Sequence, residues 1–178
     1  MTTVINLLGG PSSGKSTLAA ELYAKMKHRG LKVEMVREVA KKFAWKGHQI
    51  GPFDQLAIIG EQIEEESLLF GKVDYIVTDS PVFLGGFYMK YNHSQDFMMK
   101  MVQDYYNFAE SQNVEFFNIR LKRGKPYDPN GRFETEDQAL AIDEALYWIL
   151  HESSLMPIVY TNQINETADK ILKDLGVL

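Results

Sequence analysis

The stretch Val4-Ile-Asn-Leu-Leu-Gly-Gly-Pro-Ser-Ser-Gly-Lys-Ser-Thr17 decides the fold of this chain. Residues 9–16 match the pattern G-x-x-x-x-G-K-[ST]. An apolar run precedes them, and a segment with helical spacing, Leu18–Arg29, follows. Glycines let such a loop curl so that its amide hydrogens point inward and hold phosphate oxygens. A buried strand, this loop and a helix, in that order, predict a phosphate-binding loop. A Gly/Ser turn that matches by chance explains neither flank.

The residues of the loop have separate expected roles. Lys15 brings a positive charge to the β- and γ-phosphates of ATP or a similar triphosphate, and the Ser16 hydroxyl is an expected ligand of Mg²⁺. The helix that opens near Lys15 adds its positive dipole end. We expect the whole loop to bind the cofactors, ATP and Mg²⁺, through Gly9, Gly10, Pro11, Ser12, Ser13, Gly14, Lys15, Ser16 and Thr17.

The rest of the chain alternates short apolar runs with helical patterns. The predicted strands are Val4–Leu8, Val33–Val36, Tyr75–Thr78, Val114–Leu121 and Pro157–Tyr160. The predicted helices are Leu18–Arg29, Phe53–Phe70, Gln95–Ser111, Glu136–His151 and Asn165–Leu175, with another beginning at Pro81. This alternation predicts βαβ units and an α/β fold. We expect one domain, residues 1–178, with a mainly parallel five-stranded sheet, helices on both faces and a short lid: the three-layer P-loop fold.

A carboxylate follows the third predicted strand. In an open α/β sheet, ligands bind beyond the carboxyl ends of the strands, so Asp79 is expected to face the phosphate loop. There it would hold the water shell of Mg²⁺ or accept a proton from an acceptor hydroxyl. The alternative role is to cap the helix that begins at Pro81.

Three further residues are candidates for substrate binding. Arg37 and Glu38 follow the second predicted strand, where Glu38 would bind substrate or act as a base and Arg37 would hold an anionic group. A solvated ion pair explains these two equally well. Gln62 lies on a predicted helix that would cover the site, and its amide is suited to reading a base edge.

A basic, turn-rich segment follows the fourth predicted strand. It contains five cations (Arg120, Lys122, Arg123, Lys125 and Arg132) and the turn Asp128-Pro-Asn-Gly131. We expect a lid over residues 121–134 that excludes water and neutralises charge on the transferred phosphoryl group. Arg123 and Arg132 are the expected catalytic cations, and the sequence does not rank them. An exposed basic connector is the alternative.

Composition narrows the classes of function. The chain has 178 residues, a net charge of −5 and no cysteine. The charge argues against a broad nucleic-acid surface, and the lack of cysteine excludes disulfides and thiolate metal sites. No apolar run approaches membrane-spanning length and no signal peptide is recognisable, so we expect a cytoplasmic protein without a membrane partner. The oligomeric state stays open.

Together these features resemble the small P-loop kinases related to the ribosylnicotinamide kinase domain, a family with bacterial and viral kinase and ATPase members. The residues that carry the resemblance are Gly9–Thr17, Arg37-Glu38-Val39, the helix around Asp54–Gln62, Val77-Thr-Asp79-Ser-Pro81 and Asp128…Gly131-Arg132. The resemblance implies a parallel five-stranded sheet, ATP-Mg²⁺ as donor, Asp79 near the acceptor hydroxyl and Arg132 on the lid.

Two departures from that family bear on the acceptor. Ser80-Pro81 stand where ribosylnicotinamide kinases tend to have a second Asp, and the lid lacks their compact Asp-Gly-x-Arg pattern. The leading hypothesis is therefore a kinase that phosphorylates a nucleoside, nucleotide or similar small acceptor. The alternatives are a kinase acting on a nucleic-acid end or a hydroxymethylated base, and a nucleotide-dependent regulatory module without a small acceptor.

Overall fold

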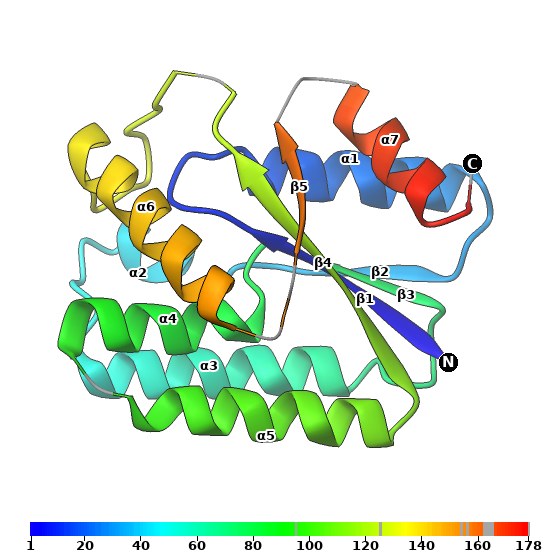
Figure 1. Cartoon of the computed structure of the whole chain (residues 1–178), viewed down its shortest axis with the longest axis horizontal. Coiled ribbons are helices and arrows are strands. Elements are labelled where there is room, and N and C mark those ends of the chain that lie inside the picture. The colour runs from blue at the N-terminus through cyan, green and yellow to red at the C-terminus, as the bar shows by residue number, and fades with distance from the viewer. Residues whose placement is uncertain (95, 125, 154, 156, 162–165, 178) are drawn as a thin grey trace.

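Five parallel strands form a single sheet in a computed structural model that describes residues 1–178 except 95, 125, 154, 156, 162–165 and 178 (Figure 1). Their order across the sheet is β2-β3-β1-β4-β5. The strands are β1 (Thr2–Leu8), β2 (Val33–Val36), β3 (Tyr75–Thr78), β4 (Val114–Lys122) and β5 (Ile158–Thr161).

Helices cover both faces of the sheet. Helices α1 and α7 lie along one face, and α3, α4, α5 and α6 cover the other (Figure 1). Their bounds are α1 (Lys15–His28), α2 (Lys41–Trp45), α3 (Pro52–Ser67), α4 (Val82–His93), α5 (Phe97–Ser111), α6 (Glu136–Glu152) and α7 (Glu166–Asp174). This is the predicted three-layer P-loop architecture, and the fold-class prediction is confirmed.

Strand β1 explains why the decisive run is apolar throughout. It pairs with β3 on one side and β4 on the other, so both of its faces lie under helices. Ile5 and Leu7 are fully buried in the core of the α1 and α7 side, and Leu8 is fully buried in the core of the opposite side. Burying such a side chain contributes about 1.5–3 kcal/mol. The central strand therefore holds the phosphate loop on a rigid support.

The predicted elements agree with the structure apart from their ends. All five strands were predicted to within two residues, and the threonine-to-glutamine capping box of α6 forms through Thr135 and Gln138. The predicted first residues of α5 and α7, Gln95 and Asn165, lie outside the described residues. The five-residue helix α2 was not predicted, because it is too short to show a helical period.

The sequence predicted where helix α4 begins but not where it ends. Two glycines, Gly85 and Gly86, interrupt its pattern. A Cβ atom at Gly85 would lie 2.8 Å from Ile59 Cδ1, and one at Gly86 would lie 2.8 Å from Val102 Cγ2. The glycines thus let α4 pack closely between α3 and α5, although glycine lowers helix propensity.

The parallel strands bring the predicted site together. Because all strands run in one direction, the loops after β1, β2, β3 and β4 emerge at the same edge of the sheet. None of the helices in the described part of the chain is both long and apolar enough to cross a membrane.

Candidate active site

The loop between β1 and α1 curls around its own lysine. Ser12 and Gly14 adopt positive φ angles of 59° and 92°, which turn the backbone before α1 begins. The Lys15 ammonium donates hydrogen bonds to the carbonyl oxygens of Gly9 (2.7 Å) and Gly10 (2.9 Å). Burial lowers the pKa of Lys15, while nearby carboxylates, Glu38 first among them, oppose that shift. The lysine is thus held over the loop by these two carbonyl oxygens.

Both glycines that open the loop are packed too closely for a side chain. A Cβ atom at Gly9 would lie 2.7 Å from Ser13 Oγ, and one at Gly10 would lie 2.3 Å from Oδ1 of Asp143. The Gly10 amide donates a hydrogen bond to that same Asp143 oxygen at 2.8 Å. Close packing against Ser13 and α6 therefore fixes the position of this part of the loop.

Two cavities lie at this edge of the sheet. The phosphate-loop cavity, of about 230 Å³, is lined by loop residues 12–17 and by Pro126 and Asp128 of the lid. The larger cavity, of about 400 Å³, lies among α2, α3, α4 and the lid. Lys15, Glu38 and Arg132 line both cavities. These three side chains mark the junction of the cavities.

Glu38 is the carboxylate at that junction. Its Oε2 atom lies 3.9 Å from Nη1 of Arg132. Burial raises the pKa of Glu38 above its usual value, and the positive charge of Lys15 opposes this shift. A carboxyl group with a raised pKa beside two cations is suited to taking up a proton.

Asp79 supports Glu38 from the end of β3. The Asp79 side chain is buried, and its Oδ1 accepts a hydrogen bond from the backbone N–H of Glu38 at 3.0 Å. It makes no side-chain capping bond to α4, which begins at Val82. Asp79 lies in neither set of cavity-lining residues, although its charge acts on Lys15. The structure thus brings Asp79 to the site through the Glu38 backbone.

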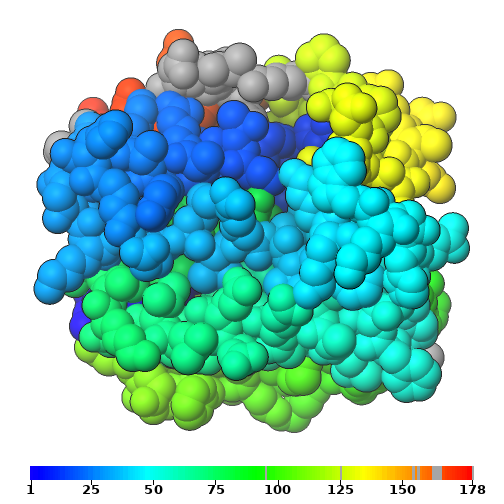
Figure 2. Space-filling view, turned by 180° about the vertical axis from the view of Figure 1, so that it is seen from behind, coloured from blue at the N-terminus to red at the C-terminus, as the bar shows by residue number. Residues whose placement is uncertain are grey.

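The lid lies against both the loop and α2. The Asp128 amide donates to Ser12 Oγ at 2.9 Å, and the Tyr127 hydroxyl donates to the carbonyl oxygen of Glu134. A Cβ atom at Gly131, which has a φ of 67°, would lie 2.9 Å from the Trp45 ring. Figure 2 shows the cyan α2 region meeting the yellow lid and the start of α6.

The lid is shorter than predicted because β4 continues to Lys122. Its pairing with β5 includes Leu121 and Lys122, so these two positions and Arg120 belong to the sheet. Lys125 lies outside the described residues. Among the described residues, 123–124 and 126–135 lie between β4 and α6.

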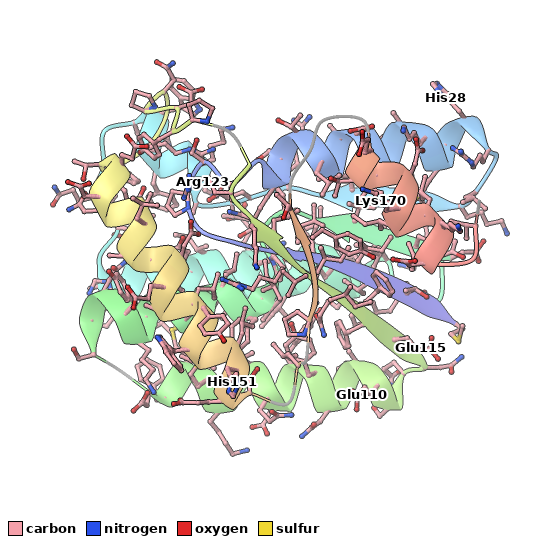
Figure 3. The ribbon with its side chains drawn as sticks, turned by 45° about the horizontal axis from the view of Figure 1, so that its top comes forward. His28, Glu110, Glu115, Arg123, His151 and Lys170 are labelled. Atoms are coloured by element: carbon pink, nitrogen blue, oxygen red, sulfur yellow. The ribbon has the colours of Figure 1, made fainter. Side chains whose placement is uncertain are left out.

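The structure separates the two lid arginines. Arg132 lines both cavities, and its Nε is buried without a hydrogen-bond partner among the residues described. Arg123 instead donates from Nη2 (2.8 Å) and Nε (3.2 Å) to Oδ2 of Asp143. Figure 3 shows Arg123 at the end of β4, between the loop after β1 and α6. Arg132 is therefore the lid cation at the junction.

Asp143 is a site residue that sequence reasoning missed. One of its oxygens accepts from Gly10 and the other from Arg123, so it connects α6 to the phosphate loop and to the root of the lid. Its position in an amphipathic helical pattern gave no signal, because the same pattern is found for an acidic residue that only faces solvent.

The remaining predicted residues differ in their placement. Gln62 is buried and lines the larger cavity. Ser16 and Thr17 line the phosphate-loop cavity, and Pro11 lines the larger one. Arg37 is exposed and lines neither cavity. The structure thus brings Glu38, but not Arg37, to the junction.

A family model described as an AAA domain (AAA_28) matches residues 4–166. The chain belongs to this family. The match runs from β1 to the start of α7 and so includes the phosphate loop, both cavities and the lid. No curated protein sequence matches the chain.

Solved structures of P-loop kinases share the fold of this AAA-domain family member. Deoxyadenosine kinase from M. mycoides with dCMP and dCDP bound has a TM-score of 0.64 at 13% identity over 98% of this chain and 100% of that one. APS kinase CysC from Mycobacterium tuberculosis in complex with AMPPNP and APS has a TM-score of 0.55 at 14% identity over 98% of each chain. The prediction of a small P-loop kinase or NTPase is confirmed. The link to ribosylnicotinamide kinase stays a prediction.

Proposed function

We propose that this protein is an ATP-dependent kinase that transfers the γ-phosphoryl group to a nucleoside, nucleotide or similarly small acceptor. The observation that carries this proposal is the junction of the two cavities at Lys15, Glu38 and Arg132. A donor in one cavity and an acceptor in the other would meet there. The two structural neighbours described above are kinases, which supports the proposal at the level of reaction class.

The phosphate loop fits the triphosphate of ATP. Loop residues 12–17 line the phosphate-loop cavity, and α1 begins there at Lys15, so backbone amides at the start of this helix can receive phosphate oxygens. On binding, Lys15 would exchange the carbonyl oxygens of Gly9 and Gly10 for phosphate oxygens. When bound, magnesium would neutralise phosphate charge. The Ser16 hydroxyl would hold the ion, and Asp79 would hold its water shell.

Glu38 is the proposed base on the acceptor side. The acceptor hydroxyl oxygen forms a bond to the γ-phosphorus, the bond from that phosphorus to the β–γ bridging oxygen breaks, and ADP leaves. The hydroxyl proton passes to Glu38. Asp79 is less suited to this step because its Oδ1 is engaged by the Glu38 amide. Since the pKa of Glu38 is raised, the transfer rate should fall as the pH decreases through that pKa.

Arg132 and the lid protect the transfer. Arg132 lines both cavities, and its Nε–H, which has no partner among the residues described, would donate to an oxygen of the transferring phosphoryl group. The lid contacts the loop through Asp128 and Ser12 and would exclude water, which favours transfer over hydrolysis. ATP as donor also fits the cytoplasmic location expected from the sequence.

The experiment that tests this function is a panel of acceptors with γ-labelled ATP. The panel contains ribo- and deoxynucleosides, their monophosphates, single-stranded DNA and RNA, and water alone. The proposal expects label in a nucleoside or monophosphate at a rate far above hydrolysis. Label only in DNA or RNA would replace it with the nucleic-acid kinase. Slow hydrolysis that no acceptor stimulates would favour a regulatory module.

A further inference from the structure

One residue that lines the larger cavity has a polar atom without a hydrogen-bond partner in the described part of the chain. Gln62 lines this cavity and is 2% exposed. Its Nε2 donates to Oε1 of Glu66 (3.2 Å) and to Oγ1 of Thr78 (3.3 Å). Its Oε1 is buried and accepts no hydrogen bond from any residue that the structure describes. A buried acceptor without a partner destabilises the protein, and a ligand that donates to it would remove that penalty.

Glu66 lies behind Gln62 and has its own fixed partner. It is 1% exposed, and its Oε2 accepts a hydrogen bond from the Tyr105 hydroxyl of α5 at 2.5 Å. An ionised carboxylate only accepts hydrogen bonds. It therefore faces the amide nitrogen of Gln62, which leaves the amide oxygen of this cavity-lining residue without a partner among the described residues.

Thr78 fits either orientation of the Gln62 amide, because its hydroxyl can both donate and accept. The Ser80 amide donates to Thr78 Oγ1 at 3.2 Å, and the Gln62 nitrogen donates to that oxygen as well. Turning the Gln62 amide over would place its oxygen against the Glu66 carboxylate. The ionised carboxylate of Glu66, held by Tyr105, thus selects one of the two amide orientations.

We propose that Glu66 is a positioning residue that keeps the Gln62 oxygen available to a ligand in the larger cavity, and that the acceptor carries an amino group that donates to it. This inference rests on the proposed function, because it names the class of acceptor for the same cavity. It predicts a nucleoside-type acceptor with an amino-bearing base, and a lower kcat/KM for acceptors without that amino group.

The test compares nucleosides that differ only in this donor. Cytidine is paired with pyrimidin-2-one riboside and adenosine with purine riboside, each also as the deoxynucleoside, because the second member of each pair lacks the amino group. Binding is measured by calorimetry and phosphorylation by transfer from γ-labelled ATP. In at least one pair, the amino-bearing member should have a kcat/KM about 10–100-fold higher.

Glu66→Gln separates the positioning role from a structural one. The neutral amide at position 66 can both donate and accept, so the Gln62 amide can turn over and the preference should fall to about one. Glu65→Gln, which removes an exposed charge one position away, is the matched control and should keep the full preference. A purely structural role would lower the rates for both members of a pair equally.

The pH dependence of the preference gives a second readout should Glu66→Gln fail to fold. Burial raises the pKa of Glu66 to about 7, with Tyr105, Tyr106 and Glu65 as the titratable groups around it. Protonated Glu66 can donate to the Gln62 oxygen, so the preference of the wild-type protein should weaken below pH 7. A preference that stays constant from pH 6 to 8.5 would overturn the inference.

The two proposals fail in different ways. Phosphorylation of nucleosides without any amino preference, or a preference unchanged in Glu66→Gln, overturns the role of Glu66 and leaves the kinase standing. Selective binding of amino-bearing nucleosides without phosphoryl transfer supports the role of Glu66 and overturns the kinase. Absence of binding by every nucleoside overturns both.

Discussion

The Oδ1 atom of Asp143 lies 2.8 Å from the backbone nitrogen of Gly10. Through this contact, helix α6 holds the loop that would bind phosphate. The other oxygen of Asp143 accepts from Arg123, so the same carboxylate also holds the root of the lid. A bond between an ionised acceptor and a backbone amide is stronger than a neutral one. We therefore expect the shape of the loop to depend on α6.

Asp143→Asn should weaken ATP binding about tenfold. The amide side chain can still accept from Gly10, but it no longer neutralises Arg123, whose side chain is only 13% exposed. Calorimetric titration with a non-hydrolysable ATP analogue measures the effect. Glu144→Gln on the same helix removes an exposed charge and is the control. Equal affinities for both variants would contradict the proposed role of Asp143.

Gly10→Ala should abolish ATP binding and lower the free energy of unfolding by about 1–3 kcal/mol. The added Cβ atom would lie 2.3 Å from Asp143 Oδ1, so either the loop or α6 must shift. Gly60→Ala serves as the control, because its Cβ atom would meet no atom within 4 Å on an exposed part of α3. That change should stabilise the protein by up to about 1 kcal/mol. Thermal unfolding with and without ATP checks both.

Arg132→Lys should reduce kcat about 10³-fold while ATP affinity changes little, because lysine keeps the charge and loses the planar guanidinium donors. Single-turnover transfer from γ-labelled ATP measures the effect. Lys122→Gln, which removes an exposed cation at the end of β4, should leave kcat within about twofold. A similar loss of rate in both variants would mean that general positive charge, and not Arg132 itself, supports transfer.

The stability of the protein should fall as the pH rises from about 4.5 to 7. The pKa of Glu66 is raised from its ordinary 4.5 to about 7, so the folded state holds this proton more tightly than the unfolded state does. The contribution of Glu66 to stability is therefore fully present below pH 4.5 and lost by about pH 7, a difference of about 3 kcal/mol. Chemical denaturation in this range measures it. Glu66→Gln should flatten the profile, and an unchanged slope would contradict this account of Glu66.

The sequence was sufficient to predict the fold and those parts of the candidate site that directly follow the strands of the sheet. Continuous apolar runs and the spacing of glycines, lysine and serine predicted the parallel sheet and the phosphate loop, because these features depend on local pattern. The position of Glu38 beside the loop followed from the common edge where parallel strands end. Features that follow from a local sequence pattern, or from the common edge of parallel strands, could therefore be predicted.

Other features of the site depend on packing between distant segments. Asp143 is 133 positions from Gly10 in the chain, and Glu66 contacts Tyr105 across two helices. No local pattern reports such pairs. The ranking of Arg132 over Arg123 at the junction also required the path of the lid, which is set by its contacts with Ser12 and Trp45.

The measurement that tests the central claim most directly is the affinity of a bisubstrate compound. Adenosine is joined through four or five phosphates to the acceptor that the labelled-ATP panel identifies, and its binding is compared with that of ATP and of the acceptor alone. If the two cavities meet at Lys15, Glu38 and Arg132, the joined compound should bind at least about 100-fold more tightly than the better of its halves. An affinity no higher than that of ATP would show that donor and acceptor do not meet at this junction.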